Sequence, residues 1–168
     1  GEGLGVSLLH WIIGDSQRSI VVEMMADGLH VYDDPVDTLA NQPTFPWHME
    51  NLRTYITATS DFPQTATWRG AELKPYGAGA GMRGIPGDCY SPSRFVKAAY
   101  LNANSRKGER DRKRRSHVPL ARGVVMIEGA SRMGDGKFEK TIYTGCFSAR
   151  TGNYYYAMYG DPSIRYVS

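Results

Sequence analysis

Residues 81–95 read GMRGIPGDCYSPSRF and join a glycine-rich loop to the start of a helix. The three glycines and one proline in the first seven positions favour neither helix nor regular strand. Ser91 and Pro92 predict a helix start, with Ser91 as N-cap and Pro92 at the first helical position. Arg94 then falls in the first turn, where a cation opposes the helix macrodipole. We therefore expect Arg94 to serve a purpose other than helix stability.

The length and charge of the chain limit the classes of protein to which it can belong. Its 168 residues suit one domain with its own core, and its net charge of +3 is mild. Much of the basic excess lies in residues 106–115, which contain no aromatic residues that stack on bases. A solvated loop is therefore favoured over a nucleic-acid-binding patch. For this reason we do not expect a nucleic acid as partner. No apolar run approaches the ~20 residues of a membrane helix, so we do not expect a membrane as partner either.

The residue types that bind metals and cofactors show no diagnostic spacing. Cys89 and Cys146 lie far apart without a CxxC pair, which favours a reducing, cytoplasmic compartment and argues against a zinc site. The four histidines form no metal-binding motif either. Residues 79–84 match G-x-G-x-x-G, but prolines flank them where a dinucleotide site needs a strand and a helix. We interpret this loop as one that allows close backbone approach, and we expect no metal or cofactor.

Hydrophobic patterns predict an α+β chain with antiparallel strands. The predicted strands, paired through turns, are residues 8–13, 19–25, 29–32, 122–128, 140–148 and 153–159. A helix is predicted from Pro46 to Tyr55, with Trp47, Leu52 and Tyr55 as its apolar face. Residues 57–80 are predicted to be a long loop, of the kind that serves function or assembly.

Two residues leave alternatives open. Cys89 precedes a helix start with Arg94 one turn on, which is a setting for a reactive thiolate, but no histidine base is placed by the sequence. A small loop residue is therefore the favoured interpretation of Cys89. Asn41 can donate its side-chain N–H to a developing oxyanion, or it can form an Asx-turn before Pro43. Spacing alone favours the turn.

Residues 41–52, NQPTFPWHMENL, resemble a segment of the choloylglycine hydrolase family, which includes penicillin V acylases and conjugated bile salt hydrolases. Residues 84–95 resemble a second segment of that family, which contains both the glycine loop and the helix start. Three shorter segments also match, at residues 9–15, 28–33 and 140–144. These five ordered segments span most of the chain, and the spacing between Asn41 and Arg94 is similar to the family's own.

The resemblance implies part of an αββα sandwich of the N-terminal-nucleophile hydrolase type. In that family a cysteine at the start of the mature chain attacks a linear amide, and its own α-amine is the base. The resemblance assigns Asn41 to stabilisation of the oxyanion and Arg94 to a place beside the sulfur, where a cation favours thiolate. It leaves Cys89 as a neighbour of the chemistry. The implied substrate is a small-molecule amide of the conjugated bile salt or penicillin V type, with no metal or cofactor.

The sequence also departs from the family. It begins at Gly1 and no residue matches the nucleophilic cysteine, so we expect residues 1–168 to be a partial domain, inactive without its N-terminal segment. A catalytically inactive remnant or interaction module that retains half of the fold is the alternative. In the complete enzyme we expect a homo-oligomer, a tetramer, assembled through the loop after Tyr55. The basic residues 106–115 lie where the family has an amphipathic helix, and we hypothesise a shifted reading frame that resequencing of the coding DNA would test.

Overall fold

The structure is a computed structural model that describes residues 9–15, 17–104, 124–147 and 151–168. Its strands form a three-stranded sheet β1–β2–β3, a hairpin β4–β5 and a second three-stranded sheet β6–β7–β8, all antiparallel. The elements are β1 (His10–Gly14), β2 (Ser19–Met25), β3 (Gly28–Asp34), α1 (Phe45–Leu52), η1 (Arg53–Tyr55), β4 (Ala66–Trp68), β5 (Ala71–Leu73), η2 (Ala80–Met82), α2 (Ser91–Asn104), β6 (Tyr143–Phe147), β7 (Tyr154–Met158) and β8 (Arg165–Val167).

The first sheet agrees with the strands predicted between residues 8 and 32. β2 lies in its centre and pairs with both neighbours. Side chains alternate along β2, so that Ser19, Val21 and Glu23 are buried on the face toward α1. Gly28 opens β3 with φ of 131°, a conformation that glycine adopts without strain.

α1 begins at Phe45, one residue before the predicted start. Thr44 precedes it but makes no side-chain cap. Instead, the Phe45 N–H donates a hydrogen bond of 2.9 Å to Oε1 of Glu23, whose side chain is 1% exposed. A carboxylate from the neighbouring sheet thus serves the helix N-terminus, where the macrodipole favours negative charge.

The buried face of α1 differs from the predicted one. Leu52 packs against the core as expected, but Trp47 is 45% exposed. Phe45 and His48 carry the buried face instead. The bond to Glu23 anchors Phe45 toward the sheet, so a residue three positions later also faces inward and Trp47 faces outward.

α2 begins at Ser91, which makes this residue the first of the helix and corrects its prediction as N-cap. The Arg94 N–H donates to the Tyr90 carbonyl, so Tyr90 occupies the cap position. Asp88 supports the same turn by accepting from the Tyr90 N–H and the Ser93 hydroxyl. The Ser91 hydroxyl is therefore available for a contact outside its own helix. Arg94 lies in the first turn, as predicted.

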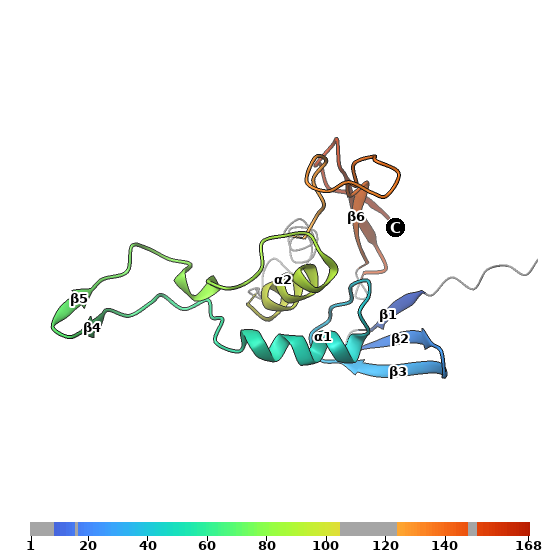
Figure 1. The fold of residues 1–168 in the computed structure, drawn as a ribbon. Coiled ribbons are helices and arrows are strands. Elements are labelled where there is room, and N and C mark those ends of the chain that lie inside the picture. The colour runs from blue at the N-terminus through green and yellow to red at the C-terminus, as the bar shows by residue number, and fades with distance from the viewer. Residues whose placement is uncertain (1–8, 16, 105–123, 148–150) are drawn as a thin grey trace, which may run out of the picture.

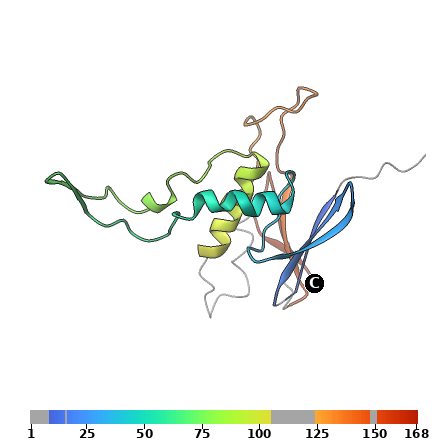
Figure 2. The same cartoon turned by 60° about the horizontal axis from the view of Figure 1, so that its bottom comes forward.

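The core lies where α1 and α2 cross over the first sheet (Figures 1 and 2). Val21, Phe45 and Phe95 form its buried centre. The rings of Phe45 and Phe95 meet edge-on with centroids 6.1 Å apart, and His48 stacks on Phe95 at 4.5 Å. One aromatic cluster therefore joins both helices. Neither described helix has the length and apolar character needed to cross a membrane.

Residues 57–80, predicted to be a loop, contain the hairpin β4–β5 and extend away from the core as an arm (Figure 1). Every residue of β4 and β5 is exposed, so no apolar alternation marks them in the sequence. The arm is closed at its base, where the Thr59 N–H donates to the Gly81 carbonyl at 3.1 Å. A Cβ on Gly81 would lie 2.2 Å from the Thr59 carbonyl oxygen, which confirms the close backbone approach predicted for this loop.

The second sheet begins with the predicted hairpin, β6 paired with β7. β8 adds a third strand that the sequence analysis did not predict. The strand predicted over residues 122–128 is wrong for the described residues 124–128, which form turns and irregular backbone. A backbone hydrogen bond links these residues to the segment before β6: the Thr141 N–H donates to the Met126 carbonyl.

Replacing Phe95 with alanine should lower the free energy of unfolding by about 3–5 kcal/mol, because a fully buried ring is lost from the core. Phe62→Ala is the matched control: this ring is 58% exposed on the arm, and its loss should change stability by less than about 0.5 kcal/mol. Urea unfolding followed by circular dichroism measures both. Equal effects of the two substitutions would contradict the core described above.

Candidate active site

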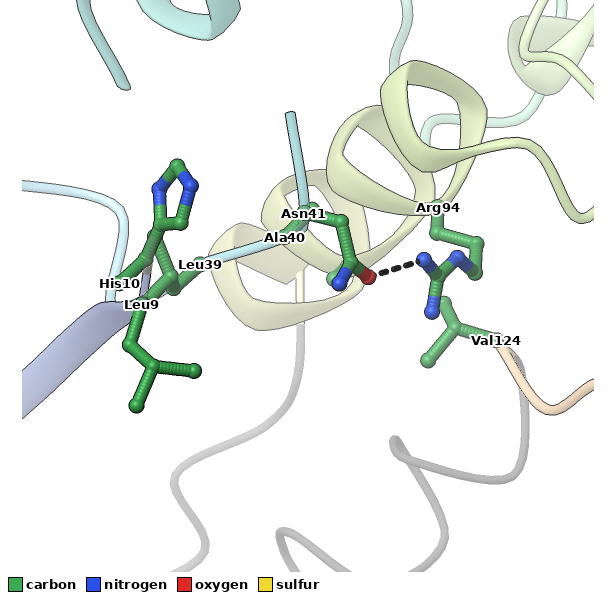
Figure 3. Close-up of a pocket in the computed structure, with 8 residues that line it drawn as sticks. Leu9, His10, Leu39, Ala40, Asn41, Arg94 and Val124 are labelled. Atoms are coloured by element: carbon green, nitrogen blue, oxygen red, sulfur yellow. Dashed lines mark hydrogen bonds between the residues drawn. The ribbon is translucent and has the colours of Figure 1, made fainter. Parts of the chain in front are cut away.

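A cavity of about 310 Å³ lies where the segment after β3 meets the first turn of α2 (Figure 3). Its walls are mostly aliphatic, and the residues that line it are Leu9, His10, Leu39, Ala40, Asn41, Arg94, Ala98 and Val124. The Asn41 amide points toward Arg94, whereas the His10 ring does not. The two residues predicted from the sequence as site residues therefore face each other in one cavity, although the chain separates them widely.

A short hydrogen bond joins Asn41 and Arg94. Nη2 of Arg94 donates to Oδ1 of Asn41 at 2.6 Å. A guanidinium carries only donors, so the amide must present its oxygen to Arg94 and its Nδ2 elsewhere. No described residue accepts a hydrogen bond from Asn41 Nδ2. The predicted Asx-turn is therefore wrong, because the side-chain oxygen binds a distant arginine and not the local backbone.

The backbone of Asn41 is also held. Its carbonyl oxygen accepts from Nε2 of His48 at 2.8 Å and from the Ser91 hydroxyl at 2.7 Å. His48 is fully buried. Burial lowers the pKa of His48, and the nearby His10 acts in the same direction, while the Asn41 carbonyl and the charge of Glu23 oppose the shift. His48 is thus a neutral donor near neutral pH.

The segment that leads from β3 to Asn41 is fixed at its start. The Asp34 carboxylate accepts from the Val36 and Thr38 N–H groups, which closes a turn directly after β3. Burial raises the pKa of Asp34 and outweighs these two hydrogen bonds. From α2, the Asn102 amide donates to the carbonyls of Val36 and Asp37 and to the Thr38 hydroxyl. Both ends of α2 therefore bind the segment that carries Asn41.

One hydrogen-bond donor of Arg94 has no partner among the described residues. Its Nε is buried, and no described residue accepts a hydrogen bond from it. The positive end of the α2 macrodipole adds to the charge of the guanidinium at the same point. A buried unpaired donor that belongs to the guanidinium cation favours a negatively charged hydrogen-bond acceptor next to Arg94.

The two cysteines of the chain do not line the cavity. Cys89 lies in the loop before α2, with its Sγ 3.6 Å from the Val125 carbonyl oxygen. Cys146 lies in β6, where burial raises the pKa of its thiol and so disfavours the thiolate. These surroundings agree with a structural interpretation of both residues.

Three residues near the site were missed by the sequence analysis: Glu23, His48 and Ser91. Glu23 is buried between Nδ1 of His10, at 2.6 Å, and the Phe45 N–H. The signal for Glu23 was an acidic residue in an apolar strand. His48 and Ser91 bind a backbone carbonyl, 7 and 50 residues away, and such a contact leaves no sequence pattern. No group of three metal-ligating side chains occurs among the described residues. The basic residues 106–115 lie outside the described part of the chain.

Comparison with known proteins agrees with the resemblance found in the sequence. A sequence model of the linear amide C–N hydrolases, choloylglycine hydrolase family, matches residues 3–168. The chain is 51% identical over 160 residues to a bile salt hydrolase/transferase from Bifidobacterium longum, a match that covers 95% of this chain and 50% of the relative. The resemblance predicted from the sequence is confirmed.

Solved structures extend the comparison to the fold. A variant of conjugated bile acid hydrolase from Clostridium perfringens matches with a TM-score of 0.86 and 32% identity, over 95% of this chain and 49% of that one. Penicillin V acylase from Agrobacterium tumefaciens matches with a TM-score of 0.67 at 15% identity, over 91% and 42% of the two chains, and so shares the fold alone. The predicted fold class is confirmed, and the chain spans about half the length of the relatives it matches.

The lowered pKa of His48 predicts how stability depends on pH. Below its ordinary value of 6.5, the unfolded chain binds a proton at this residue that the folded chain does not. The free energy of unfolding should therefore fall as pH drops from about 6.5, and His48→Gln should flatten this slope. His30→Gln, a change at a more exposed histidine paired with Asp27, should retain it. Urea unfolding between pH 5.5 and 7.5 measures the slopes, and identical slopes in His48→Gln and the parent chain would exclude this role.

Proposed function

The chain belongs to the choloylglycine hydrolase family of linear amide C–N hydrolases, and on that premise we propose that it supplies one half of an amide-hydrolysing site. The other half, a segment that begins with the nucleophilic cysteine, is proposed to lie upstream, since the chain spans about half the length of its relatives. The observation that carries this proposal is the hydrogen bond of 2.6 Å from Arg94 to Asn41 in a mostly aliphatic cavity.

Asn41 is proposed to stabilise the tetrahedral oxyanion. Its Oδ1 is taken by Arg94, so its Nδ2 is left to donate to an acceptor in the cavity. A donor that is fixed before the reaction stabilises developing negative charge without a cost of reorientation. The bond from Arg94 therefore supports Asn41 as a donor and not as an acceptor.

Arg94 is proposed to lie beside the sulfur of the upstream cysteine. Its unpaired, buried Nε suits an anionic acceptor, and a fixed cation lowers the pKa of a nearby thiol. The α-amine of the cysteine takes the thiol proton, and the thiolate attacks the amide carbonyl carbon. The C–N bond then breaks, the leaving nitrogen takes that proton, and a thioester remains. Water, deprotonated by the same amine, cleaves the thioester to release the acid and restore the thiol.

An exposed apolar face supports the proposal that a further segment covers this chain. Trp11, Val22 and Val31 lie opposite one another across the first sheet, on the face turned away from α1. Trp11 is 42% exposed and Val31 is 58% exposed. A sheet with apolar residues on both faces is typical of the interior of a layered domain. The proposed partial domain, residues 1–168, therefore needs a covering layer.

The proposed substrate is a conjugated bile salt or a penicillin V-type amide, the classes named for the relatives. The purified chain should release neither glycine or taurine from conjugated bile salts nor phenoxyacetate from penicillin V. Adding an upstream polypeptide that begins with cysteine should generate activity, and we call this pair the reconstituted enzyme. Binding of the two without hydrolysis would instead support an inactive remnant or interaction module, and activity of the chain alone would refute the split site.

Asn41→Asp should lower kcat of the reconstituted enzyme by about 10²–10³-fold, because it keeps an acceptor for Arg94 but deletes the Nδ2 donor. Cys89→Ser is the control, since this thiol lies outside the cavity, and it should leave kcat unchanged. Steady-state release of the amine product measures both. Full activity of Asn41→Asp would remove Asn41 from the proposed oxyanion site.

The arm at residues 57–80 is proposed to join copies of the chain into the homo-oligomer. It extends from the core and exposes large apolar side chains, with Trp68 72% exposed and Ile56 just before it 80% exposed. Large apolar side chains exposed on a segment that projects from the core suit a protein–protein contact.

Trp68→Glu should therefore shift the reconstituted enzyme to smaller species, because a charge would be buried at the contact. Met133→Glu places the same charge at an exposed turn outside residues 57–80 and should leave the assembly intact. Sedimentation velocity distinguishes the species. An unchanged distribution for Trp68→Glu would exclude Trp68 from the contact.

A further inference from the structure

We propose that His48 and Ser91 are positioning residues for Asn41: together they hold its backbone carbonyl, and so they direct its free Nδ2 into the cavity. The inference deepens the proposed function and rests on it for its kinetic consequence. Its basis is geometric. Three donors from two helices converge on one residue, two on the carbonyl oxygen and one on Oδ1.

His48 is a rigid donor. Its ring is fully buried, stacked on Phe95 with an interplanar angle of 10° and meeting Trp47 edge-on at 5.6 Å. The Asn41 carbonyl can only accept, so the hydrogen must be on Nε2. Nδ1 has no partner among the described residues, as expected of a ring held in one neutral tautomer.

Ser91 is an unusual donor for its position. A serine at the start of a helix usually serves that helix, but the hydroxyl of Ser91 binds the Asn41 carbonyl, 50 residues away, at 2.7 Å. The neighbouring hydroxyl of Ser93 makes a local contact with Asp88. The two serines therefore differ in what they hold, although they lie two residues apart in the same turn.

The combined contacts leave Asn41 little freedom. A carbonyl oxygen has two lone pairs, and His48 and Ser91 occupy one each. With Arg94 on Oδ1, the backbone and the side chain of Asn41 are both fixed. Asn41 is itself exposed, whereas His48, one of the two donors to its carbonyl, is fully buried. A contact from a buried histidine to an exposed residue is explained if the direction of the Asn41 side chain matters. That direction does matter for a donor to an oxyanion.

The kinetic test uses the reconstituted enzyme with Ser91→Ala, Ser91→Thr and the matched control Ser93→Ala. Ser91→Ala should lower kcat about 10-fold to 100-fold through a small displacement of Asn41, with KM changed by less than about twofold. Ser91→Thr should restore most of the loss because it keeps the hydroxyl. Ser93→Ala should retain the parent kcat. A parental kcat in Ser91→Ala, or a loss that Ser91→Thr does not restore, would overturn the inference.

His48 is tested in the same assay. His48→Gln can place an amide N–H near the position of Nε2 and should retain more kcat than His48→Leu, which has no donor. Urea midpoints show which variants are folded. If His48→Leu does not fold, the kcat of His48→Gln compared with that of Ser91→Ala still tests the role of the histidine. Equal kcat in folded His48→Leu and the parent would contradict the role of the histidine.

A second readout needs no activity. The Asn41 side-chain amide gives a pair of NMR signals, identified by their loss in Asn41→Asp. These signals should shift or broaden in Ser91→Ala and stay unchanged in Ser93→Ala. If the reconstituted parent hydrolyses no amide, the proposed function fails. The NMR measurement then decides by itself whether His48 and Ser91 position Asn41. Signals that do not respond to Ser91→Ala would refute it.

Discussion

A guanidinium group can donate hydrogen bonds but cannot accept them, and the arrangement of the site depends on this restriction. Because Arg94 Nη2 binds Asn41, the amide has one possible orientation, with its oxygen toward the arginine and its nitrogen directed elsewhere. The other polar contacts of the region keep the two partners at this distance. His48 and Ser91 hold the Asn41 backbone, and Asn102 holds the segment before it.

The two helices that carry these residues have charges of opposite sign at their N-termini. α1 receives a buried carboxylate from Glu23, which agrees with the sign of the macrodipole. α2 carries Arg94 in its first turn, which opposes it and costs about 0.3–1 kcal/mol in an exposed helix. Asp88 offsets part of this cost: hydrogen bonds from the Tyr90 N–H and the Ser93 hydroxyl lower its pKa, so it remains a carboxylate at the helix start. α2 thus tolerates a cation at the place where the proposed site requires one.

Local signals in the sequence predicted the elements whose patterns are local. Alternation located the strands of the first sheet, and Ser91-Pro92 located the start of α2. β4 and β5 were missed because all of their residues are exposed, and β8 because it has three residues. The face of α1 was wrong because a contact from Glu23, 22 residues earlier, sets its rotation. Spacing alone did not favour Asn41 as a site residue; the resemblance to a family did. The support from His48 and Ser91 runs through a backbone carbonyl, and no residue pattern encodes such a contact.

The closed base of the arm has a consequence for how the protein can vary. The chain leaves the core at Thr59 and returns at Gly81, and a backbone hydrogen bond joins these two points. Everything between them is therefore a cassette whose length does not alter the spacing of its ends. Asn41 and Arg94 lie on either side of this cassette, so insertions or exchanges at its tip, near Arg69 and Gly70, would leave their separation in space unchanged. The proposed contact between copies and the proposed chemistry can then diversify independently within one continuous chain.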